Sequence, residues 1–431
     1  MYYSPHLMSM LQSIDAAEGD TIRISGDGRD ISGVLQPSGE FSHPDVLVVK
    51  MDSGYDVGVR ITPSMNVNII AKGEVKTIPS RVPSKGKGLP RVAILGTGGT
   101  ISSYADQRTG AVHPALSAED LLNTVPEIAD ICDVNAEAVF SIFSENMSVD
   151  NWQQLAEVTA DYLNSGIDGV IILHGTDTMS YTAAALSFML GDIPKPVIIT
   201  GAQRSSDRPS SDAYINLYSA AQFILSSDAA EVLVLMHDSP SDTSVAVHRA
   251  TKVRKMHTSR RDAFQSINIS PIAKLGSEGD IAYLESYNQK SNVRVSPRLG
   301  MEKDVAFIQY YPGMSPTIFE NIIAKNKGVV ISGTGLGHVN SELIKPMRKA
   351  IESGTVIVMT SQCLSGSVNL NVYSTGRDLL SAGVISGEDM LPETAYVKLM
   401  WALGQTDDVV EVRKIMASNL RGELSDRRLM Q

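Results

Sequence analysis

Two segments rich in glycine and threonine contain the residues best suited to chemistry. Residues 96–100 (GTGGT) and residues 174–178 (HGTDT) each follow a short apolar run. Thr100 ends the first segment, and Thr176 lies beside Asp177 in the second. A threonine hydroxyl is a weak nucleophile, so a nearby base must remove its proton. A lysine whose pKa is lowered by desolvation can be that base, so the two segments favour nucleophilic catalysis by threonine.

Other chemistries fit the sequence less well. The spacing of residues 96–100 matches neither GxGxxG nor GxxxxGK[ST], which argues against a nucleotide site. No Gly-x-Ser-x-Gly elbow follows an apolar run, which argues against an α/β-hydrolase. The eight histidines form no HExxH or similar cluster, and Cys132 and Cys363 have no zinc spacing. We therefore expect no metal in this chain.

The chain after residue 90 has the pattern of an α/β domain. Apolar runs that predict strands lie at 92–95, 169–173, 197–200, 232–236, 329–332 and 356–360. Between them, residues 148–166 have apolar side chains at helical spacing, and Ser148 can cap the start of this helix and Gly166 its end. This alternation is typical of a parallel sheet covered by helices on both faces.

Several loops after the predicted strands are rich in glycine and threonine. They lie at 96–100, 174–178, 201–204 (GAQR) and 333–335 (GTG). In parallel sheets, ligands bind at the carboxyl ends of the strands, where small residues let backbone amides approach. We therefore expect these four loops to share one site.

Residues 19 to 72 have a different pattern. Short alternating or apolar runs at 21–24, 46–49 and 57–61 are separated by turn-forming residues, with no helical period between them. This pattern predicts a small all-β barrel or roll. A polar stretch rich in proline, glycine and lysine follows, so we place a β-barrel domain at 1–80 and a linker at 81–90.

The threonine motifs resemble those of the L-asparaginase/glutaminase family. GTGGTI and HGTDTM are similar to its two hallmark motifs, GAQR is similar to a third, and the resemblance covers about residues 91–431. It implies an asparaginase-like fold of two lobes, at 91–290 with the active site and at 301–431. It also implies hydrolysis of a side-chain carboxamide, in which a threonine attacks the carbonyl and water releases the acyl group.

The same resemblance assigns roles to individual residues. It makes Thr100 one catalytic threonine, and it makes Thr176 and Asp177 part of a second group that a lysine completes. Counting back from the DAF segment places this lysine at Lys255, with Lys252 as the alternative. The implied substrate-binding residues are Ser144, Glu145, Gly99 and Tyr104.

The N-terminal extension resembles that of the D subunits of archaeal glutamyl-tRNA(Gln) amidotransferases, which carry a small SH3-like barrel, and residues 247–264 look characteristic of that family. The resemblance implies a subunit that hydrolyses glutamine and delivers ammonia to an E-type partner. The partner uses ATP and Mg²⁺ to activate Glu-tRNA(Gln), so we expect no cofactor in this chain. It further implies a heterodimer or heterotetramer with that partner, a homodimer through the asparaginase-like domain, and contact with tRNA(Gln) mainly through the partner. Residues 102–114 are a candidate for a loop that closes when the partner docks.

Charge and hydropathy agree with this division of labour. The chain has 37 Lys and Arg against 48 Asp and Glu, a net charge of −11, which argues against nucleic-acid binding by this chain alone. We expect a cytoplasmic location, since no signal-peptide pattern or membrane-length apolar run is present. Two alternatives stay open: a free-standing L-asparaginase/glutaminase, and a binding module that retains only the fold. The intact threonines, aspartate and lysine argue against the second.

Overall fold

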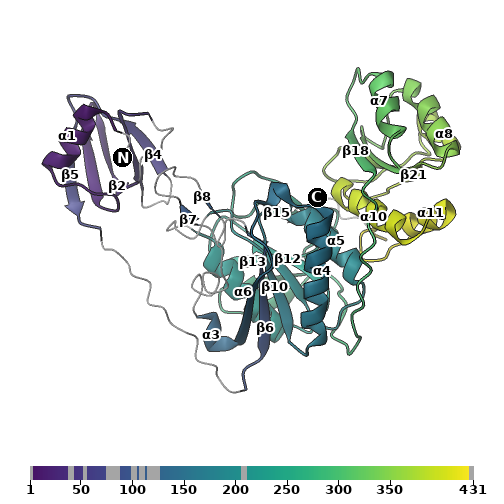
Figure 1. Cartoon of the computed structure of the whole chain (residues 1–431), viewed down its shortest axis with the longest axis horizontal. Coiled ribbons are helices and arrows are strands. Elements are labelled where there is room, and N and C mark those ends of the chain that lie inside the picture. Colours follow the sequence, from purple (N-terminus) through teal and green to yellow (C-terminus); the bar gives the residue numbers. More distant parts are fainter. Residues whose placement is uncertain are drawn as a thin grey trace.

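The computed structural model describes the chain in several stretches. They are residues 3–36, 43–51, 56–73, 88–98, 104–105, 112–113, 127–204 and 211–426. Along the chain, an N-terminal β domain is followed by a lobe built on a large sheet and a lobe built on a smaller sheet (Figure 1). Among the described residues, no helix has both the length and the apolar character to cross a membrane.

The N-terminal domain is one helix and a five-stranded antiparallel sheet of order β4-β3-β2-β1-β5. Its elements are α1 (Pro5–Ser13), β1 (Thr21–Gly26), β2 (Arg29–Leu35), β3 (Val46–Lys50), β4 (Asp56–Arg60) and β5 (Asn66–Ala71). Leu7 and Leu11 of α1 join the sheet's buried residues in one core. The strands predicted at β1, β3 and β4 are confirmed, whereas β2 and β5 were missed because polar residues interrupt their apolar ones.

The first lobe contains an eight-stranded sheet of order β17-β16-β13-β12-β11-β10-β6-β9. Its strands are β6 (Arg91–Gly96), β9 (Asp133–Ala138), β10 (Gly169–Leu173), β11 (Val197–Thr200), β12 (Val232–His237), β13 (Ser244–Arg249), β16 (Ala273–Gly276) and β17 (Ile281–Tyr283). The five strands from β9 to β12 are parallel, as predicted. The strand β13 is antiparallel to β12, because the short connection between them has no room for a crossover helix, and β16 and β17 continue this edge with antiparallel pairing.

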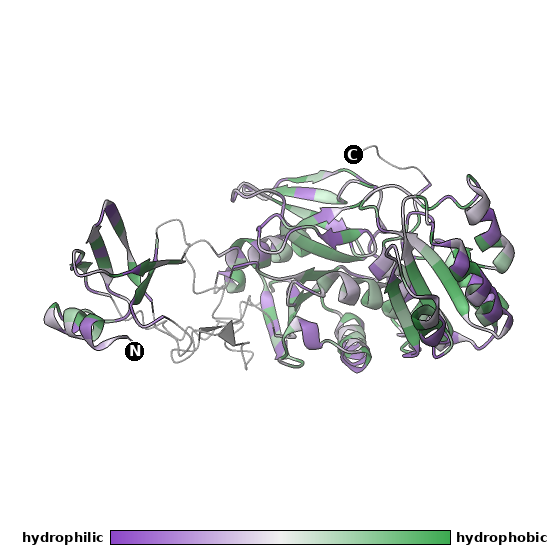
Figure 2. Ribbon diagram, turned by 90° about the horizontal axis from the view of Figure 1, so that it is seen from above, coloured by the Kyte–Doolittle hydropathy of each residue, from purple (hydrophilic) through white to green (hydrophobic). Residues whose placement is uncertain are grey.

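Helices cover both faces of this sheet. They are α3 (Ile128–Ile131), α4 (Val149–Asn164), α5 (Met179–Leu190) and α6 (Ala213–Ser226). Ala93 and Leu95 of β6 pack into the core of α4 and α5, whereas Val92 and Ile94 pack into the core of α6. The strands of the lobes are largely hydrophobic, and several flanking helices turn a hydrophilic side outward (Figure 2). The predicted helix is confirmed: Ser148 forms a capping box at the start of α4.

The second lobe has a parallel four-stranded sheet of order β18-β19-β20-β21. Its elements are β18 (Val305–Gln309), α7 (Pro316–Ile323), β19 (Gly328–Gly333), α8 (Ile344–Glu352), β20 (Val356–Ser361), α9 (Ser374–Ala382), β21 (Ile385–Ser386), α10 (Pro392–Gln405) and α11 (Val409–Ala417). Helix α10 lies between the lobes and packs on α5 and β19 (Figure 1). Trp401 of α10 stacks on Phe188 of α5, with ring centroids 5.8 Å apart. The lobes therefore share one hydrophobic core.

Short elements complete the described chain. They are the 3-10 turns η2 (Ser144–Asn146) and η3 (Ser341–Leu343), the pair β7 (Tyr104–Ala105) and β8 (Val112–His113), and the hairpin β14 (Val253–Lys255) and β15 (Phe264–Ser266).

Candidate active site

Three of the four predicted loops start at one edge of the large sheet. Strands β6, β10 and β11 are parallel neighbours, and their last residues Gly96, Leu173 and Thr200 lie side by side. The loops that contain residues 97–100, 174–178 and 201–204 therefore begin at the same edge. The fourth loop, 333–335, follows β19 in the smaller sheet, so the prediction that it belongs to this edge is wrong. The two lobes that the family resemblance implies, at 91–290 and 301–431, already place this loop in the second lobe, whereas the strand pattern alone does not separate the two sheets.

The second threonine motif and the predicted lysine are in contact. The Lys255 Nζ donates a hydrogen bond to Thr176 Oγ1 at 2.8 Å and pairs with Asp177 Oδ1 at 2.7 Å. Thr176 is buried, whereas the Asp177 side chain is 69% exposed, so one end of the group faces solvent. The alternative lysine, Lys252, is buried against Asp389 at 2.6 Å. The structure thus brings Lys255, and not Lys252, to the threonine.

The predicted substrate-binding pair borders this group. Ser144 and Glu145 form most of η2, and the Ser144 carbonyl accepts the Thr178 hydroxyl at 2.7 Å. Ser144 also packs so tightly on Gly175 that a Cβ at this glycine would lie 2.7 Å from the Ser144 Cβ. Ser144 is buried and Glu145 is exposed. Glycine at position 175 therefore allows η2 to approach the threonine loop.

The first motif is described only in part. Gly99, Thr100 and residues 106–111 lie outside the described residues, and the structure gives only the backbone of Tyr104, in β7. The start of the loop is firmly attached to β10: the N–H and the hydroxyl of Thr97 both donate to the Leu173 carbonyl, at 3.1 and 2.9 Å. Gly98 has φ +100°, and a Cβ there would lie 2.3 Å from the Ile142 carbonyl oxygen. The loop thus leaves the sheet close to the second motif.

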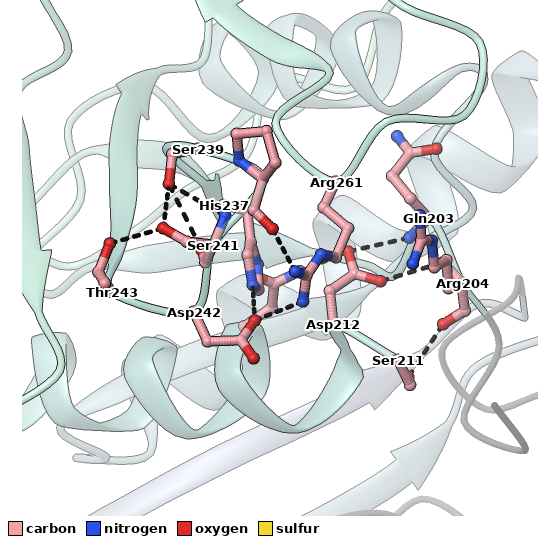
Figure 3. Close-up of polar contacts among 12 residues, drawn as sticks. Gln203, Arg204, Ser211, Asp212, His237, Ser239, Ser241, Asp242, Thr243 and Arg261 are labelled. Carbon is pink, nitrogen blue, oxygen red and sulfur yellow. Dashed lines mark hydrogen bonds and ion pairs between the residues drawn. The ribbon is translucent and has the colours of Figure 1, made fainter. Parts of the chain in front are cut away.

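A polar network that the sequence did not predict holds the third loop (Figure 3). The buried Asp212 accepts the backbone N–H groups of Gln203 and Arg204, at 3.1 and 3.0 Å. Asn216, one turn later, donates to the Gly201 carbonyl at 2.9 Å. An aspartate and an asparagine four residues apart lie on one helix face. This spacing was the signal in the sequence from which a polar contact of Asp212 and Asn216 with the third loop could have been predicted.

The network continues to the hairpin that carries the lysine. His237 Nδ1 lies 2.7 Å from Asn216 Oδ1, and His237 Nε2 lies 3.3 Å from Asp242 Oδ1. Asp242 is ion-paired with Arg261, which lies in the turn between β14 and β15 (Figure 3). Burial lowers the pKa of His237, whereas the carboxylates of Asp212 and Asp242 act in the opposite direction. The third loop and the lysine hairpin are thus connected by side chains from three separate segments.

Comparisons with known proteins agree with this arrangement. Residues 16–70 match the GatD N-terminal domain, residues 91–289 match Asparaginase, N-terminal, and residues 304–416 match the Glutaminase/Asparaginase C-terminal domain. The chain is 51% identical over 416 residues to the D subunit of the glutamyl-tRNA(Gln) amidotransferase of Pyrococcus furiosus, and the match covers 94% of each chain. The chain belongs to the D-subunit family of glutamyl-tRNA(Gln) amidotransferases. The D subunit of Methanobrevibacter smithii is 47% identical, over 99% of this chain and 98% of the relative.

Solved structures support the fold of this D-subunit family member. The thermostable L-asparaginase from Thermococcus kodakarensis superposes with a TM-score of 0.69 at 32% identity, over 78% of this chain and 99% of the asparaginase. L-asparaginase I from Vibrio cholerae gives a TM-score of 0.67 at 31% identity, over 78% of this chain and 99% of that enzyme. The predicted asparaginase-like fold and the resemblance to the D subunits are both confirmed.

We expect two buried histidines to make the stability of the protein depend on pH. Burial lowers the pKa of His174, beside the threonine motif, to about 4, and burial lowers the pKa of His248 in β13 to about 4. Unfolded histidine titrates near 6.5, so the unfolded chain binds more protons between about pH 6.5 and pH 4. The free energy of unfolding should therefore fall as the pH falls through this window, by about 3 kcal/mol for each histidine at pH 4.

We expect His248→Asn to remove one of these two contributions. His248 Nδ1 lies 2.8 Å from the Ser266 hydroxyl, so an asparagine amide can keep a polar contact there. Urea unfolding of both proteins at pH 7, 6 and 5 measures the effect. Between pH 6 and 5, the free energy of unfolding of the variant should fall less steeply, by about 1 kcal/mol per pH unit. If the free energy of unfolding fell equally steeply with pH in both proteins, His248 would not be one of the groups that take up a proton on unfolding.

Proposed function

We propose that this chain is the glutaminase subunit of a tRNA-dependent amidotransferase. It hydrolyses the side-chain amide of glutamine and supplies ammonia to a partner subunit, which converts Glu-tRNA(Gln) to Gln-tRNA(Gln) with ATP. The observation that carries this proposal is the contact of Lys255 with Thr176 and Asp177. The near full-length similarity to D subunits of glutamyl-tRNA(Gln) amidotransferases supports glutamine as the amide and a tRNA-linked reaction as its purpose.

The reaction follows from what these groups can do. A threonine Oγ attacks the amide carbon, its proton is taken up by the site, and the C–N bond breaks to release ammonia. Backbone amides at the glycine-rich loops stabilise the oxyanion, and water then frees glutamate and regenerates the hydroxyl. Lys255, 2.8 Å from Thr176 Oγ1, is placed to take and return that proton. The exposed carboxylate of Asp177 suits the α-amino group of glutamine, while Ser144 and Glu145 border the substrate.

Partners and location complete the proposal. The E-type partner holds ATP and Mg²⁺ and binds most of the tRNA(Gln), and the two proteins form a heterodimer or heterotetramer. The net charge of −11 supports this division, because the chain has no general positive field for the phosphates of tRNA. A second copy of the chain pairs through the asparaginase-like domain. The assembly works in the cytoplasm, where charged tRNA is made and used.

Coupling to the partner gives a direct test. Free ammonia release would waste glutamine, so the chain alone should turn over glutamine slowly, and the partner with Glu-tRNA(Gln) should raise kcat/KM at least about tenfold, or about 1.4 kcal/mol of transition-state stabilisation. The measurement is ammonia release by the chain alone, with its E-type partner, and with partner plus Glu-tRNA(Gln).

The likeness to asparaginases supplies the alternative outcome. A free-standing asparaginase/glutaminase would show equal, rapid turnover under all three conditions, with asparagine accepted as readily as glutamine. The Thr176→Val variant, purified in the same way, is the control: any ammonia release that it shows comes from contaminating amidohydrolases.

A further inference from the structure

The strand that carries Lys255 lies outside the large sheet. Among the described strands, β14 pairs with β15 in a separate two-stranded sheet, where Lys255 is opposite Phe264. The other loops of the site start from strands that are hydrogen-bonded on both sides within the eight-stranded sheet. The position of Lys255 therefore depends on what the hairpin is attached to.

The residues just before Lys255 bind the second lobe. The Lys252 Nζ pairs with Asp389 Oδ2 at 2.6 Å and donates to the Asp389 carbonyl at 3.1 Å. The Arg254 Nε lies 3.3 Å from Glu393 Oε1. The Thr251 carbonyl accepts the Thr394 hydroxyl at 2.9 Å. Three of the four residues that precede Lys255 are thus held by residues 389–394.

The contact of Lys252 with Asp389 is shielded from water, and Glu393 is buried too. The side chains of Lys252 and Asp389 are 0% and 1% exposed, and the Glu393 side chain is 7% exposed. The backbone N–H of Ser425 donates to the second oxygen of Asp389 at 3.1 Å, which fixes that carboxylate from the other side. A buried ion pair is a weak source of stability, because desolvation offsets the attraction between the charges; in some proteins such a pair instead specifies the arrangement of the groups that it joins.

The second strand of the hairpin is attached to the same lobe, at the same open end. Asn268, which follows β15, has a positive φ of 66° and is buried. Its side chain donates to the Gly366 carbonyl at 2.9 Å and accepts the Gly366 N–H at 2.8 Å. Asp389 lies three residues before α10, and Glu393 and Thr394 belong to its first turn; α10 is the helix that packs on α5 of the first lobe (Figure 1). Both strands of the hairpin are thus attached to the second lobe at their open end, whereas its turn is held in the first lobe by the ion pair of Arg261 with Asp242.

We propose that the second lobe positions Lys255: Asp389, through Lys252, and Glu393, through Arg254, are positioning residues that set the distance from the lysine amine to Thr176. Thr176 belongs to the first lobe, whereas the open end of the Lys255 hairpin is attached to the second lobe. The 2.8 Å hydrogen bond from Lys255 Nζ to Thr176 Oγ1 therefore depends on how the two lobes are placed. A misplacement of about 1 Å between reacting groups can lower a rate about a hundredfold. The inference rests on the proposed hydrolysis of glutamine by this site.

The test separates placement from stability. The double variant Lys252→Met/Asp389→Leu replaces the buried pair with apolar side chains, an exchange that often leaves stability unchanged or higher. We expect a folded protein whose stability in urea is close to that of the wild-type chain, lowered at most by the loss of the acceptor for the Ser425 N–H, with a kcat for glutamine at least about tenfold lower and a KM within about twofold. If the pair of Lys252 and Asp389 contributed only to stability, the stable double variant would have the kcat of the wild-type chain. That result would overturn the proposal.

A matched control exists in the same lobe. Lys398 and Glu423 form a second buried pair, at 2.6 Å with both side chains 0% exposed. Lys398→Met/Glu423→Leu should leave kcat within about twofold of wild type, because neither side chain contacts the hairpin directly; the nearest link is the Arg421 backbone, whose N–H Glu423 accepts and whose carbonyl accepts the Thr251 hydroxyl at 2.9 Å. An equal loss of kcat in the control would show that any buried pair has this effect, and it would overturn the specific role of Asp389.

A second variant keeps the proposal testable if the double variant does not fold. The Arg254 side chain is 31% exposed, so Arg254→Gln breaks the contact with Glu393 at a less buried place. We expect kcat to fall several-fold with KM nearly unchanged, and an unchanged kcat would count against the proposal. All variants are compared with the wild-type chain in the presence of its partner. If the wild-type chain itself hydrolyses no glutamine, the proposed function fails; if the wild-type chain is active and the variants retain its full activity, the positioning role fails.

Discussion

Replacing Thr176 with valine should lower the kcat for glutamine by at least about three orders of magnitude, which corresponds to about 4 kcal/mol. Valine keeps the volume of the side chain and removes the hydroxyl that Lys255 contacts at 2.8 Å. The amine of Lys255 keeps its contact with Asp177, so the loss of stability should be about 1 kcal/mol. Stopped-time ammonia assays and urea unfolding measure the two quantities on the same protein.

The control for this variant is another buried threonine. The Thr182 hydroxyl accepts the Trp152 indole N–H at 2.9 Å, inside the core between α4 and α5. Thr182→Val should lower stability by a similar amount and leave kcat within about twofold. If Thr176→Val retained near wild-type turnover while folded, Thr176 would be a turn residue, and the reaction would have to use another group.

Replacing Thr100 with valine should lower the kcat for glutamine by at least about three orders of magnitude as well. This prediction comes from the sequence, because Thr100 lies outside the described residues. The pair of variants also shows which threonine carries the acyl group. After rapid acid quench, intact-protein mass spectrometry should detect an acyl-enzyme in the variant that keeps the nucleophile and lacks the proton relay. A Thr100→Val protein with wild-type turnover would remove Thr100 from the mechanism.

Much of the site's framework could be predicted because it depends on local patterns. The buried strands β10 and β11 coincide with the apolar runs at 169–173 and 197–200, since a strand buried on both faces needs continuous apolar side chains. Helix α4 begins where Ser148 can cap it. Loops at the ends of adjacent parallel strands then have to meet, which brings the first two motifs together without any knowledge of distant contacts.

What the sequence left open depends on partners far away in the chain. Lys252 and Lys255 have almost the same local surroundings, and they differ only in that one meets Asp389, 137 residues away, and the other meets Thr176, 79 residues away. The network of Asp212, His237 and Arg261 was missed for the same reason, because no local pattern joins these segments. The antiparallel β13 was missed because a short loop, and not a hydrophobic pattern, decides its direction.

Replacing Lys255 with methionine should abolish measurable glutamine hydrolysis, with a loss of at least about three orders of magnitude. The amine is the group placed to move the Thr176 proton, and methionine offers neither a base nor a charge for Asp177. Lys255→Arg keeps the charge but should be equally inactive, because a guanidinium does not give up its proton. If Lys255→Arg were active, the lysine would act only through its positive charge.

The comparison with Lys252 tests the register of this lysine. Lys252→Met alone is a poor control, because it leaves the Asp389 carboxylate buried without its cation and should cost about 3–5 kcal/mol of stability. The double variant Lys252→Met/Asp389→Leu removes both charges and should retain a reduced but measurable kcat. Lys255→Met should stay inactive at every temperature at which it is folded, since its defect is chemical. The opposite ranking, with an active Lys255→Met and an inactive, stable double variant, would assign the proton transfer to Lys252, three residues earlier in the chain.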